Sequence, residues 1–204
     1  MINVSNEFKQ LMTERQDFKC NAEVTLANGT VLPLGEDDFS IDNNSLVDAA
    51  GANTIPLGVA LSRNVQLEIM NDDDHLSNYD FFGAKIRLYI TFELSETTEK
   101  IEYGTFTVTQ PETYGSVVTI VGYDDMYKAD KAYSTALTFP ATAKSVLIDS
   151  CDTCGILIGD SNFLHNDFQI PTMPSSEYTH RQIIGFIAMI SCGNARIDRT
   201  GDCR

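Results

Sequence analysis

Hydrophobic and polar residues alternate along most of the chain from residue 18 to residue 123, which is the pattern of β-strands that bury one face. The alternating hydrophobic positions are Cys20, Ala22, Val24 and Leu26; Val31, Leu32 and Leu34; Val65, Leu67 and Ile69; Ile86, Leu88, Ile90 and Phe92; Ile101 to Val108; and Val117 to Val121. Asn28-Gly29 is a strong hairpin signal between the first two groups, and polar turn residues separate the others. About six or seven short strands in this arrangement predict an antiparallel β-barrel or sandwich.

The period changes to that of a helix at the N-terminus. Residues 6–15 place Phe8, Leu11 and Met12 on one face, and Ser5 is a suitable N-cap residue. We therefore expect a short helix that packs its apolar face on the strands that follow.

Helical patterns return after Tyr123. Residues 141–154 form one pattern, and Gly155 follows it as a helix-ending residue. A second helix begins at a Thr179 cap, runs to Cys192 and is ended by Gly193. The positions expected to be buried on these two helices are Ala143, Val146, Leu147, Cys151 and Cys154, and then Ile183, Ile184, Ile187, Ala188 and Ile190. The stretch between them, residues 156–178, is expected to be loop with short extended pieces.

These patterns predict a mainly β protein with helices (α+β). Residues 1–123 are expected to form an N-terminal helix and an antiparallel β-barrel, and residues 124–204 a helical segment that leads into an incomplete second β domain. Residues 196–199 alternate like a strand, 200–202 suggest a hairpin turn, and only Cys203 and Arg204 remain for the returning strand. We interpret the chain as a piece of a longer protein whose returning strand lacks its partners.

The net charge of −15 comes from 29 acidic residues against 14 basic ones, and the basic residues do not cluster. Nucleic-acid binding needs neutralisation of phosphates, so direct affinity for DNA or RNA is not expected. Solubility is the simpler reason for the acidity, and a surface that repels polyanions is the alternative. The N-terminus does not resemble a secretory signal, and no apolar run approaches the roughly 20 residues of a membrane span. We expect synthesis in a cytoplasm and no membrane partner.

Asp72-Asp73-Asp74-His75 is the first candidate for a metal site, since carboxylates and an imidazole can bind a hard cation. Adjacent residues point in different directions, however, and a calcium loop has ligands at alternating positions. A solvated turn between two strands is the favoured interpretation.

Five cysteines without a secretory signal indicate free thiols. Cys151 and Cys154 have zinc or redox spacing, and Cys192 with Cys203 could complete four ligands. The first two lie on the apolar side of the predicted helix, and the later two are too far apart in sequence for the usual motif. We therefore favour packing in the core.

No residues in the sequence form a recognisable catalytic motif. His75, His165 and His180 have no motif around them, so solvated or capping roles are expected. Residues 191–193 (Ser-Cys-Gly) end a helix and lack the first glycine of a nucleophile elbow. The sequence accordingly predicts no catalytic residue, no cofactor and no metal, and a protein that is not an enzyme.

Tyr79, Phe81 and Phe82 could form an aromatic platform for a sugar. They precede a strand, and the chain has no tryptophan, so core and edge positions are the favoured interpretation. A cell-surface or carbohydrate-binding β module nevertheless remains the alternative function, and a hydrolase the third.

Short motifs along most of the chain resemble tail proteins of phages and prophages of Gram-positive bacteria. They are Tyr123-Asp124-Asp125-Met126, Lys131-Ala132-Tyr133, Phe139-Pro140, Cys154-Gly155-Ile156, then Arg181, Gly185, Ala188 and the run from Gly193 to Gly201, with Asn28-Gly29-Thr30 and Phe82-Gly83-Ala84 nearer the N-terminus. The proteins concerned are the baseplate hub of contractile tails and the tail-associated protein at the tip of flexible ones.

The resemblance implies a structural component of the virion tail, assembled in the bacterial cytoplasm. It implies a ring, usually a homotrimer, whose subunits each carry two similar barrels and which joins the tail tube to the distal tail or tip proteins. The second barrel would begin near Ala195. Members of this group often carry a wall-degrading domain, which nothing in this sequence matches. Carboxylates lining such a ring would let DNA pass without binding, which would account for the acidity.

Overall fold

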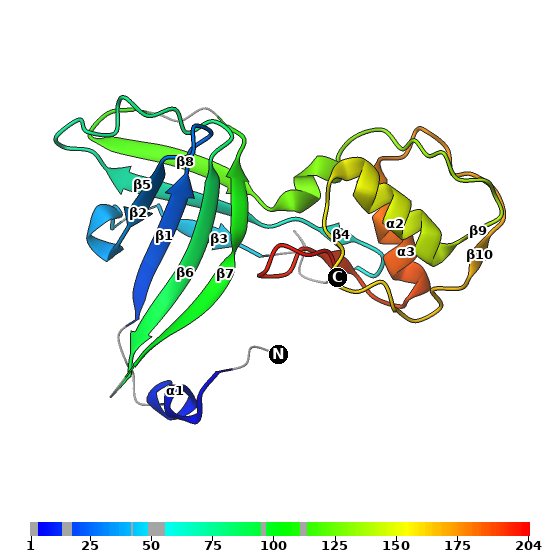
Figure 1. The fold of residues 1–204 in the computed structure, drawn as a ribbon, viewed down its shortest axis with the longest axis horizontal. Helices are drawn as coiled ribbons and strands as arrows, with labels where there is room; N and C mark the ends of the chain where they lie inside the picture. The colour runs from blue at the N-terminus through cyan, green and yellow to red at the C-terminus, as the bar shows by residue number, and fades with distance from the viewer. Residues whose placement is uncertain (1–3, 14–17, 42, 49–55, 95–96, 111–113) are drawn as a thin grey trace. The chain divides into compact units, whose positions relative to one another are not determined.

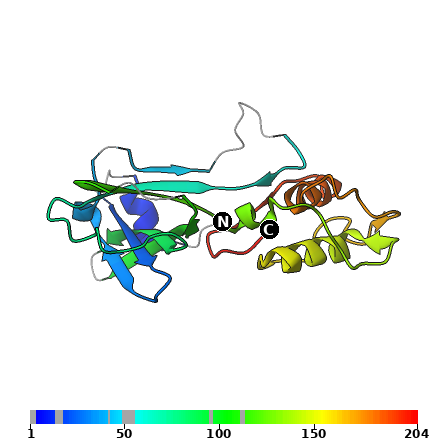
Figure 2. The same ribbon diagram turned by 90° about the horizontal axis from the view of Figure 1, so that it is seen from above.

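The computed structural model describes residues 4–13, 18–41, 43–48, 56–94, 97–110 and 114–204. The chain divides into two compact units (Figures 1 and 2). Unit 1 comprises residues 1–45 and 66–122, and unit 2 comprises residues 46–65 and 123–204. The two units therefore alternate along the sequence, because residues 46–65 belong to the same unit as the C-terminal residues 123–204.

Most of unit 1 belongs to a seven-stranded sheet with the strand order β2-β1-β6-β7-β8-β5-β3, although the greater part of β3 and the first residues of β5 fall in unit 2. Its strands are β1 (Lys19–Thr25), β2 (Val31–Leu34), β3 (Ser45–Val47), β5 (Asn64–Met70), β6 (Lys85–Glu93), β7 (Thr98–Val108) and β8 (Val117–Tyr123). Neighbours along the chain pair antiparallel, as in β1 with β2 and β6 with β7. The mainly β fold with helices is confirmed.

Of the two predicted forms, a barrel or a sandwich, the described strands do not make a closed barrel, because they form an open order that begins at β2 and ends at β3. After β2 the chain turns through the 3-10 helix η1 (Glu36–Asp38). Phe39 then bridges Ile69 of β5, and the Ser40 amide donates to the Glu68 carbonyl at 2.8 Å. The chain thus passes from one edge of the sheet to the other, and no described pairing joins β2 to β3.

The alternation in the sequence accounts for the buried face of the sheet. Leu67 and Ile69 of β5 and Ile86 of β6 are buried, whereas their neighbours in sequence are more exposed. Gly29 takes a left-handed backbone (φ 86°) in the hairpin between β1 and β2, as its Asn-Gly pair predicts.

The N-terminal helix α1 (Asn6–Leu11) begins at the predicted cap, where the Ser5 hydroxyl accepts the Phe8 amide at 3.0 Å. Phe8 is buried, with its ring edge-on to Phe92 at 4.6 Å. Met12 follows the helix and is exposed, so its predicted place on the packed face is wrong. The helix ends earlier than predicted, and part of its expected last turn lies outside the described residues.

Unit 2 packs two helices over short pieces of sheet, and both views draw α2 and α3 side by side (Figures 1 and 2). Its elements are β4 (Ala60–Leu61), η2 (Asp125–Ala129), β9 (Ala141–Thr142), α2 (Ala143–Cys154), β10 (Gln169–Ile170), α3 (His180–Ile190) and β11 (Ala195–Arg196). Both helices and the short extended pieces between them were predicted. All of the expected buried positions are buried except Ala188 and Ile190, which are partly exposed.

The C-terminal residues form the predicted hairpin. Arg196 and Arg204 exchange two backbone hydrogen bonds of 2.8 Å, and Cys203 bridges Ile197. Cys203 also bridges Ile158 on its other side. The expectation that the returning strand lacks partners is therefore wrong for Cys203, because residues near the end of α2 supply one.

The two helices of unit 2 end in the same way. Gly155 after α2 has a left-handed backbone (φ 65°), and Cys192 after α3 has nearly the same one (φ 58°). The Gly193 amide then donates to the Ala188 carbonyl at 2.9 Å, which closes the last turn. The sequence assigned the end of α3 to Gly193, but the strained position belongs to the cysteine before it.

Replacing Cys192 with glycine should therefore stabilise unit 2 by about 0.5–1 kcal/mol. A side chain in the left-handed region costs about 1–2 kcal/mol, and glycine avoids this cost. Part of the gain is offset because glycine gives the unfolded chain more conformational entropy. The matched change Gly155→Ala should cost about 1 kcal/mol. Urea unfolding followed by circular dichroism measures both. A Cys192→Gly protein with a lower unfolding midpoint than the wild type contradicts this account.

Candidate functional site

A short extended segment, residues 58–63, contacts both α3 and the C-terminal hairpin within unit 2. Its strand β4 pairs in parallel with β11. The Ala195 amide donates to the Val59 carbonyl at 3.0 Å, and the Val59 amide donates to the Asn194 side-chain oxygen at 3.0 Å. We call residues 58–63 the inserted segment, because they lie within residues 46–65, the stretch of unit 2 that interrupts unit 1 in the sequence.

Gly185 allows α3 to lie directly on the inserted segment. A Cβ atom at this position would be 2.6 Å from the Gly58 carbonyl oxygen and 3.4 Å from the Ala60 amide nitrogen. Real Cβ atoms do not approach a backbone oxygen so closely, so any larger residue would push the helix away from the segment. The glycine is thus required by close packing, whereas its place in a helix is otherwise unfavourable.

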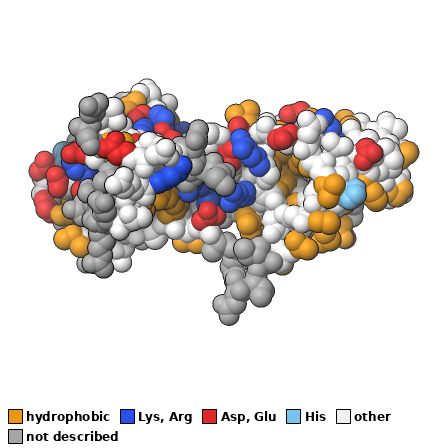
Figure 3. Space-filling model, turned by 90° about the horizontal axis from the view of Figure 1, so that it is seen from below, with side chains coloured by type: hydrophobic (Ala, Val, Ile, Leu, Met, Phe, Trp, Pro, Cys, Tyr) orange, Lys and Arg blue, Asp and Glu red, His pale blue; other side chains and the backbone are white. Residues whose placement is uncertain are grey.

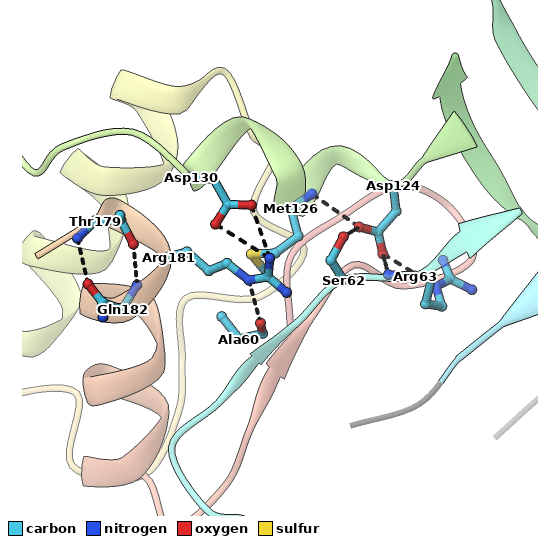
Figure 4. Close-up of polar contacts among 9 residues, drawn as sticks. All are labelled: Ala60, Ser62, Arg63, Asp124, Met126, Asp130, Thr179, Arg181 and Gln182. Carbon is cyan, nitrogen blue, oxygen red and sulfur yellow. Dashed lines mark hydrogen bonds and ion pairs between the residues drawn. The ribbon is translucent and has the colours of Figure 1, made fainter. Parts of the chain in front are cut away.

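Asp124, the residue before η2, lies beside the last residues of the inserted segment and accepts three hydrogen bonds (Figure 4). One carboxylate oxygen accepts the Arg63 amide at 2.9 Å, and the other accepts the Ser62 hydroxyl at 2.9 Å and the Met126 amide at 3.3 Å. The residue is fully buried. Burial raises the pKa of the Asp124 carboxyl, and the hydrogen bonds from Arg63 and Ser62 and the charge of Arg63 oppose that shift.

The Arg63 guanidinium is the buried counter-ion of this carboxylate. Its Nε lies 3.5 Å from an Asp124 oxygen, and its Nη2 donates to the Asp198 carbonyl at 3.0 Å. One arginine therefore connects the inserted segment, the start of η2 and the C-terminal hairpin. We call this group of residues, Ser62, Arg63, Asp124 and Asp198, the buried junction.

Arg181 makes a second polar connection to the same segment. Its Nε donates to the Ala60 carbonyl at 2.9 Å, and its Nη1 is 3.0 Å from an Asp130 oxygen (Figure 4). The helix turn that carries Arg181 is fixed by reciprocal hydrogen bonds between Thr179 and Gln182, which form a capping box. The cap at Thr179 was predicted from the sequence.

Three residues that carry the sequence resemblance, Asp124, Arg181 and Gly185, therefore meet on the inserted segment. Sequence reasoning did not identify Ser62 or Arg63, which complete the arrangement. No local signal could have found them, because the segment is short and pairs with residues far away in sequence.

The candidate metal residues lie in an exposed turn after β5 in unit 1. Asp72, Asp73 and Asp74 are all exposed; Asp73 bonds His75, and Asp74 bonds Ser77. Within the described ranges, no three His, Cys, Asp or Glu side chains are grouped so that they could hold a metal ion.

The four candidate zinc or redox cysteines are not brought together. Cys151, Cys154 and Cys203 are buried in the core of unit 2, but Cys192 is exposed after α3. Cys20, in β1, is partly buried, and all five cysteines are free thiols. Packing in the core is confirmed for Cys151 and Cys154.

His180 is fully buried at the start of α3, so the expectation of a solvated histidine is wrong for it. Its Nε2 accepts the Ser134 amide at 3.3 Å, and its ring lies 5.0 Å from the Tyr133 ring, edge-on. Burial lowers the pKa of His180, and the nearby charge of Lys131 lowers it further. His75 and His165 are exposed, in line with the expectation.

The remaining candidates do not form a site. Phe81 is buried and Tyr79 partly buried, so only Phe82 of the proposed sugar platform is exposed. Ser191 ends α3, and its hydroxyl donates to the Ile187 carbonyl at 3.2 Å. This hydroxyl therefore closes the helix.

An exposed apolar strip follows one side of α3. It consists of Leu57, Tyr178, Phe186 and Met189, which are 60%, 41%, 42% and 51% exposed. The Tyr178 and Phe186 rings lie 5.2 Å apart, edge-on, and Met189 lies against Gly58. Figure 3 shows hydrophobic side chains gathered over the part of the molecule formed by unit 2. We call these four residues the α3 strip.

The negative charge is concentrated in the other unit. Unit 1 has 18 Asp and Glu against 6 Lys and Arg, a net charge of −12, whereas unit 2 has 11 against 8, a net charge of −3. The unit with the apolar strip therefore carries little net charge, and the unit with the large sheet carries most of it.

Comparison with known proteins gives limited similarity. No family model and no curated protein match the sequence. Chains of three solved PdpA–VgrG complexes are similar in structure. The half-lidded Francisella complex has a TM-score of 0.45 and 10% identity, and the match covers 81% of this chain and 28% of that chain. For the lidless complex the TM-score is 0.44, the identity 11% and the two coverages 77% and 28%; for the lidded Francisella complex the TM-score is 0.42, the identity 12% and the coverages 76% and 22%. The chain spans about a quarter of the length of these chains.

Similarity at these TM-scores defines neither a fold nor a function for this chain. In the described part of the chain, no helix combines the length and the apolar character that a membrane span requires.

Removal of the Asp124 carboxylate should disrupt the buried junction. Asp124→Ala leaves the Arg63 guanidinium buried without this counter-ion, which typically costs about 3–5 kcal/mol. The neighbouring change Asp125→Ala removes a partly exposed partner of Lys128 and should cost less than about 1 kcal/mol. Chemical unfolding of both variants measures the difference. Equal losses of stability contradict a special role for the buried carboxylate.

His180 should make stability depend on pH near neutrality. Because burial lowers the folded pKa below the ordinary 6.5, the unfolded chain binds the proton more readily. The stability that neutral His180 contributes is present above about pH 6.5 and is lost as the pH falls toward the folded pKa, with a slope of up to about 1.4 kcal/mol per pH unit.

The variant His180→Gln should show a shallower decline of unfolding free energy between about pH 7.5 and 5.5 than the wild type. His165→Gln changes an exposed histidine and should leave the decline as it is. If His180→Gln and the wild type have the same pH profile, His180 does not carry this dependence.

Proposed function

We propose that this chain is a structural subunit of a phage-tail-like assembly, not an enzyme. The observation that carries the proposal is the α3 strip, because contiguous exposed apolar side chains on a packed pair of helices are typical of protein contact surfaces. Its helix is fixed by the capping box at Thr179 and Gln182 and by the close contact at Gly185. The sequence resemblance to hub and tip proteins of phage tails supports the same conclusion.

The specific role that we propose is that of a hub-like ring, a homotrimer, between the tail tube and the tip proteins. Its place would be the virion tail, after assembly in the bacterial cytoplasm. The weak net charge of unit 2 supports self-association through the α3 strip, since little like-charge repulsion opposes contact there.

The acidity of unit 1 has a role in this proposal. Exposed carboxylates occur together in η1, at Glu36, Asp37 and Asp38, and again at Asp72, Asp73 and Asp74. A surface of this kind repels the phosphates of DNA, so a channel bordered by unit 1 would let DNA pass without binding it. The alternative of a carbohydrate-binding module loses support, because Phe81, one of the three residues that could have formed an aromatic platform, is buried.

Light scattering of the purified chain tests the proposal. The wild type should form a particle of three chains at high protein concentration, and Phe186→Glu with Met189→Glu should shift it to the mass of one chain. A charged residue in the contact surface would be desolvated without a partner, which opposes association. Phe82→Glu is a matched control, since Phe82 is 59% exposed but lies in unit 1.

The control should keep the mass of the wild type. A wild-type chain that stays a monomer at high concentration contradicts the proposed self-association through the α3 strip. A trimer that survives both changes on α3 shows that another surface makes the contact.

A further inference from the structure

Unit 2 contains a cavity of about 130 Å³ between α3 and the C-terminal hairpin, with further walls from α2 and the loop that follows it. An apolar cavity of about 150 Å³ accepts a benzene molecule, so this one has room for one apolar side chain, such as an isobutyl or phenyl group. Its apolar lining includes Leu147, Phe163, Ile184, Ile187, Ala188 and Cys203.

The side-chain oxygens of Ser191 and Asn194, which also line the cavity, are hydrogen-bonded within unit 2. The Ser191 hydroxyl donates to the Ile187 carbonyl at 3.2 Å, and the Asn194 oxygen accepts the Val59 amide at 3.0 Å. Because a polar group loses free energy when it is buried without a hydrogen-bond partner, the interior of the cavity favours an apolar occupant. Charge can therefore be recognised only at the rim.

Two opposite charges lie at this rim. Asp160 and Arg204 both line the cavity, and both are exposed. A Cβ atom at Gly159 would lie 2.9 Å from the Arg204 Nε, so the arginine side chain lies against the residue that precedes Asp160. The cavity thus opens to solvent where a carboxylate and a guanidinium come from neighbouring stretches of chain.

Both rim charges can accept a further partner. One Asp160 oxygen accepts the Asn162 amide at 2.7 Å, but the carboxylate has no basic partner among the described residues. The Arg204 Nε lies 2.8 Å from an Asp198 oxygen, which holds the guanidinium in place. In the described part of the chain, the two Nη groups of Arg204 have no carboxylate partner, and their geometry suits one.

We propose that this cavity binds a free α-amino acid whose side chain is apolar and of the size of leucine or phenylalanine. The side chain enters the cavity, the ammonium group pairs with Asp160, and the carboxylate pairs with the Nη groups of Arg204. A zwitterion of this kind matches the apolar wall and both rim charges at once. An uncharged apolar molecule matches the wall alone and leaves both charges without partners.

The cavity lies on the opposite side of α3 from the α3 strip. Ile184 and Ile187 face the cavity, whereas Phe186 and Met189 of the strip lie about half a helical turn away from them. The proposed site therefore does not depend on self-association through the strip. An amino acid that fails to bind leaves the tail-assembly proposal as it is, and a monomeric chain leaves the cavity intact.

Titration of the folded protein with L-phenylalanine, followed by amide NMR shifts, tests the site. The shifts should saturate with a Kd of about 1 mM, because one buried side chain and two exposed ion pairs give only modest affinity. They should be largest at Ile184, Ala188 and Arg204, which line the cavity. Glycine carries both charges without an apolar side chain and should give no saturable shift.

Two further ligands separate the contributions of the charges. Phenethylamine lacks the carboxylate, and 3-phenylpropionate lacks the ammonium group. Each should bind up to about fivefold more weakly than L-phenylalanine, since an exposed ion pair contributes little more than this.

Variants assign each charge to its residue. Asp160→Asn should weaken L-phenylalanine by up to about fivefold and leave 3-phenylpropionate unaffected, and Arg204→Gln should do the same for L-phenylalanine while leaving phenethylamine unaffected. Asp152→Asn is the matched control, because Asp152 is an exposed carboxylate of α2 that does not line the cavity. This control should bind all three ligands as the wild type does.

The proposal is overturned if L-phenylalanine gives no saturable shift at the cavity residues of the wild type. It is equally overturned if phenethylamine or 3-phenylpropionate binds the wild type as tightly as L-phenylalanine, because the zwitterion would then not be recognised. The ligand series on the wild type decides the question, so a variant that folds poorly does not affect the conclusion.

Discussion

The buried ion pair between Arg63 and Asp124 is the interaction on which the arrangement of unit 2 depends. A carboxylate removed from water is stable only with hydrogen bonds and an opposite charge, and here all of them come from residues 62–63 and 126. The arginine also bonds the Asp198 carbonyl, so one pair of charges joins three stretches of chain that are far apart in sequence. Unit 2 is in this way a single body made from interleaved pieces.

Local patterns predicted most of the elements. The alternation at Leu67 and Ile69, the caps at Ser5 and Thr179 and the glycine after α2 act within a few residues, so a sequence alone reveals them. The open sheet and the inserted segment could not be predicted, because both depend on pairing between distant strands. Similarly, Cys151 and Cys154 were expected in the core, but their spacing does not show that Cys203 joins the same core.

The candidate functional residues show the same contrast between local sequence patterns, which can be read from the sequence, and contacts between distant residues, which cannot. Adjacent acidic residues at 72–74 suggested a metal, yet they lie exposed in a turn, because neighbouring side chains diverge. His180 had no motif around it, and its burial comes from contacts with residues near 131–134. The features that bear on function are surface properties of the two units: unit 2 carries an exposed apolar strip, and unit 1 carries most of the negative charge. The assembly role that we propose rests on these two surfaces.

Amide hydrogen exchange tests most directly whether the inserted segment is an integral part of unit 2. The amides of Arg63, Asp124 and Ala195, which bond across the separate stretches, should exchange as slowly as those of Ile183 and Ile184 in α3. All five should then open together in a single cooperative event. Fast exchange at Arg63 and Asp124, with α3 still protected, would contradict the account, because unit 2 would then be stable without the buried junction.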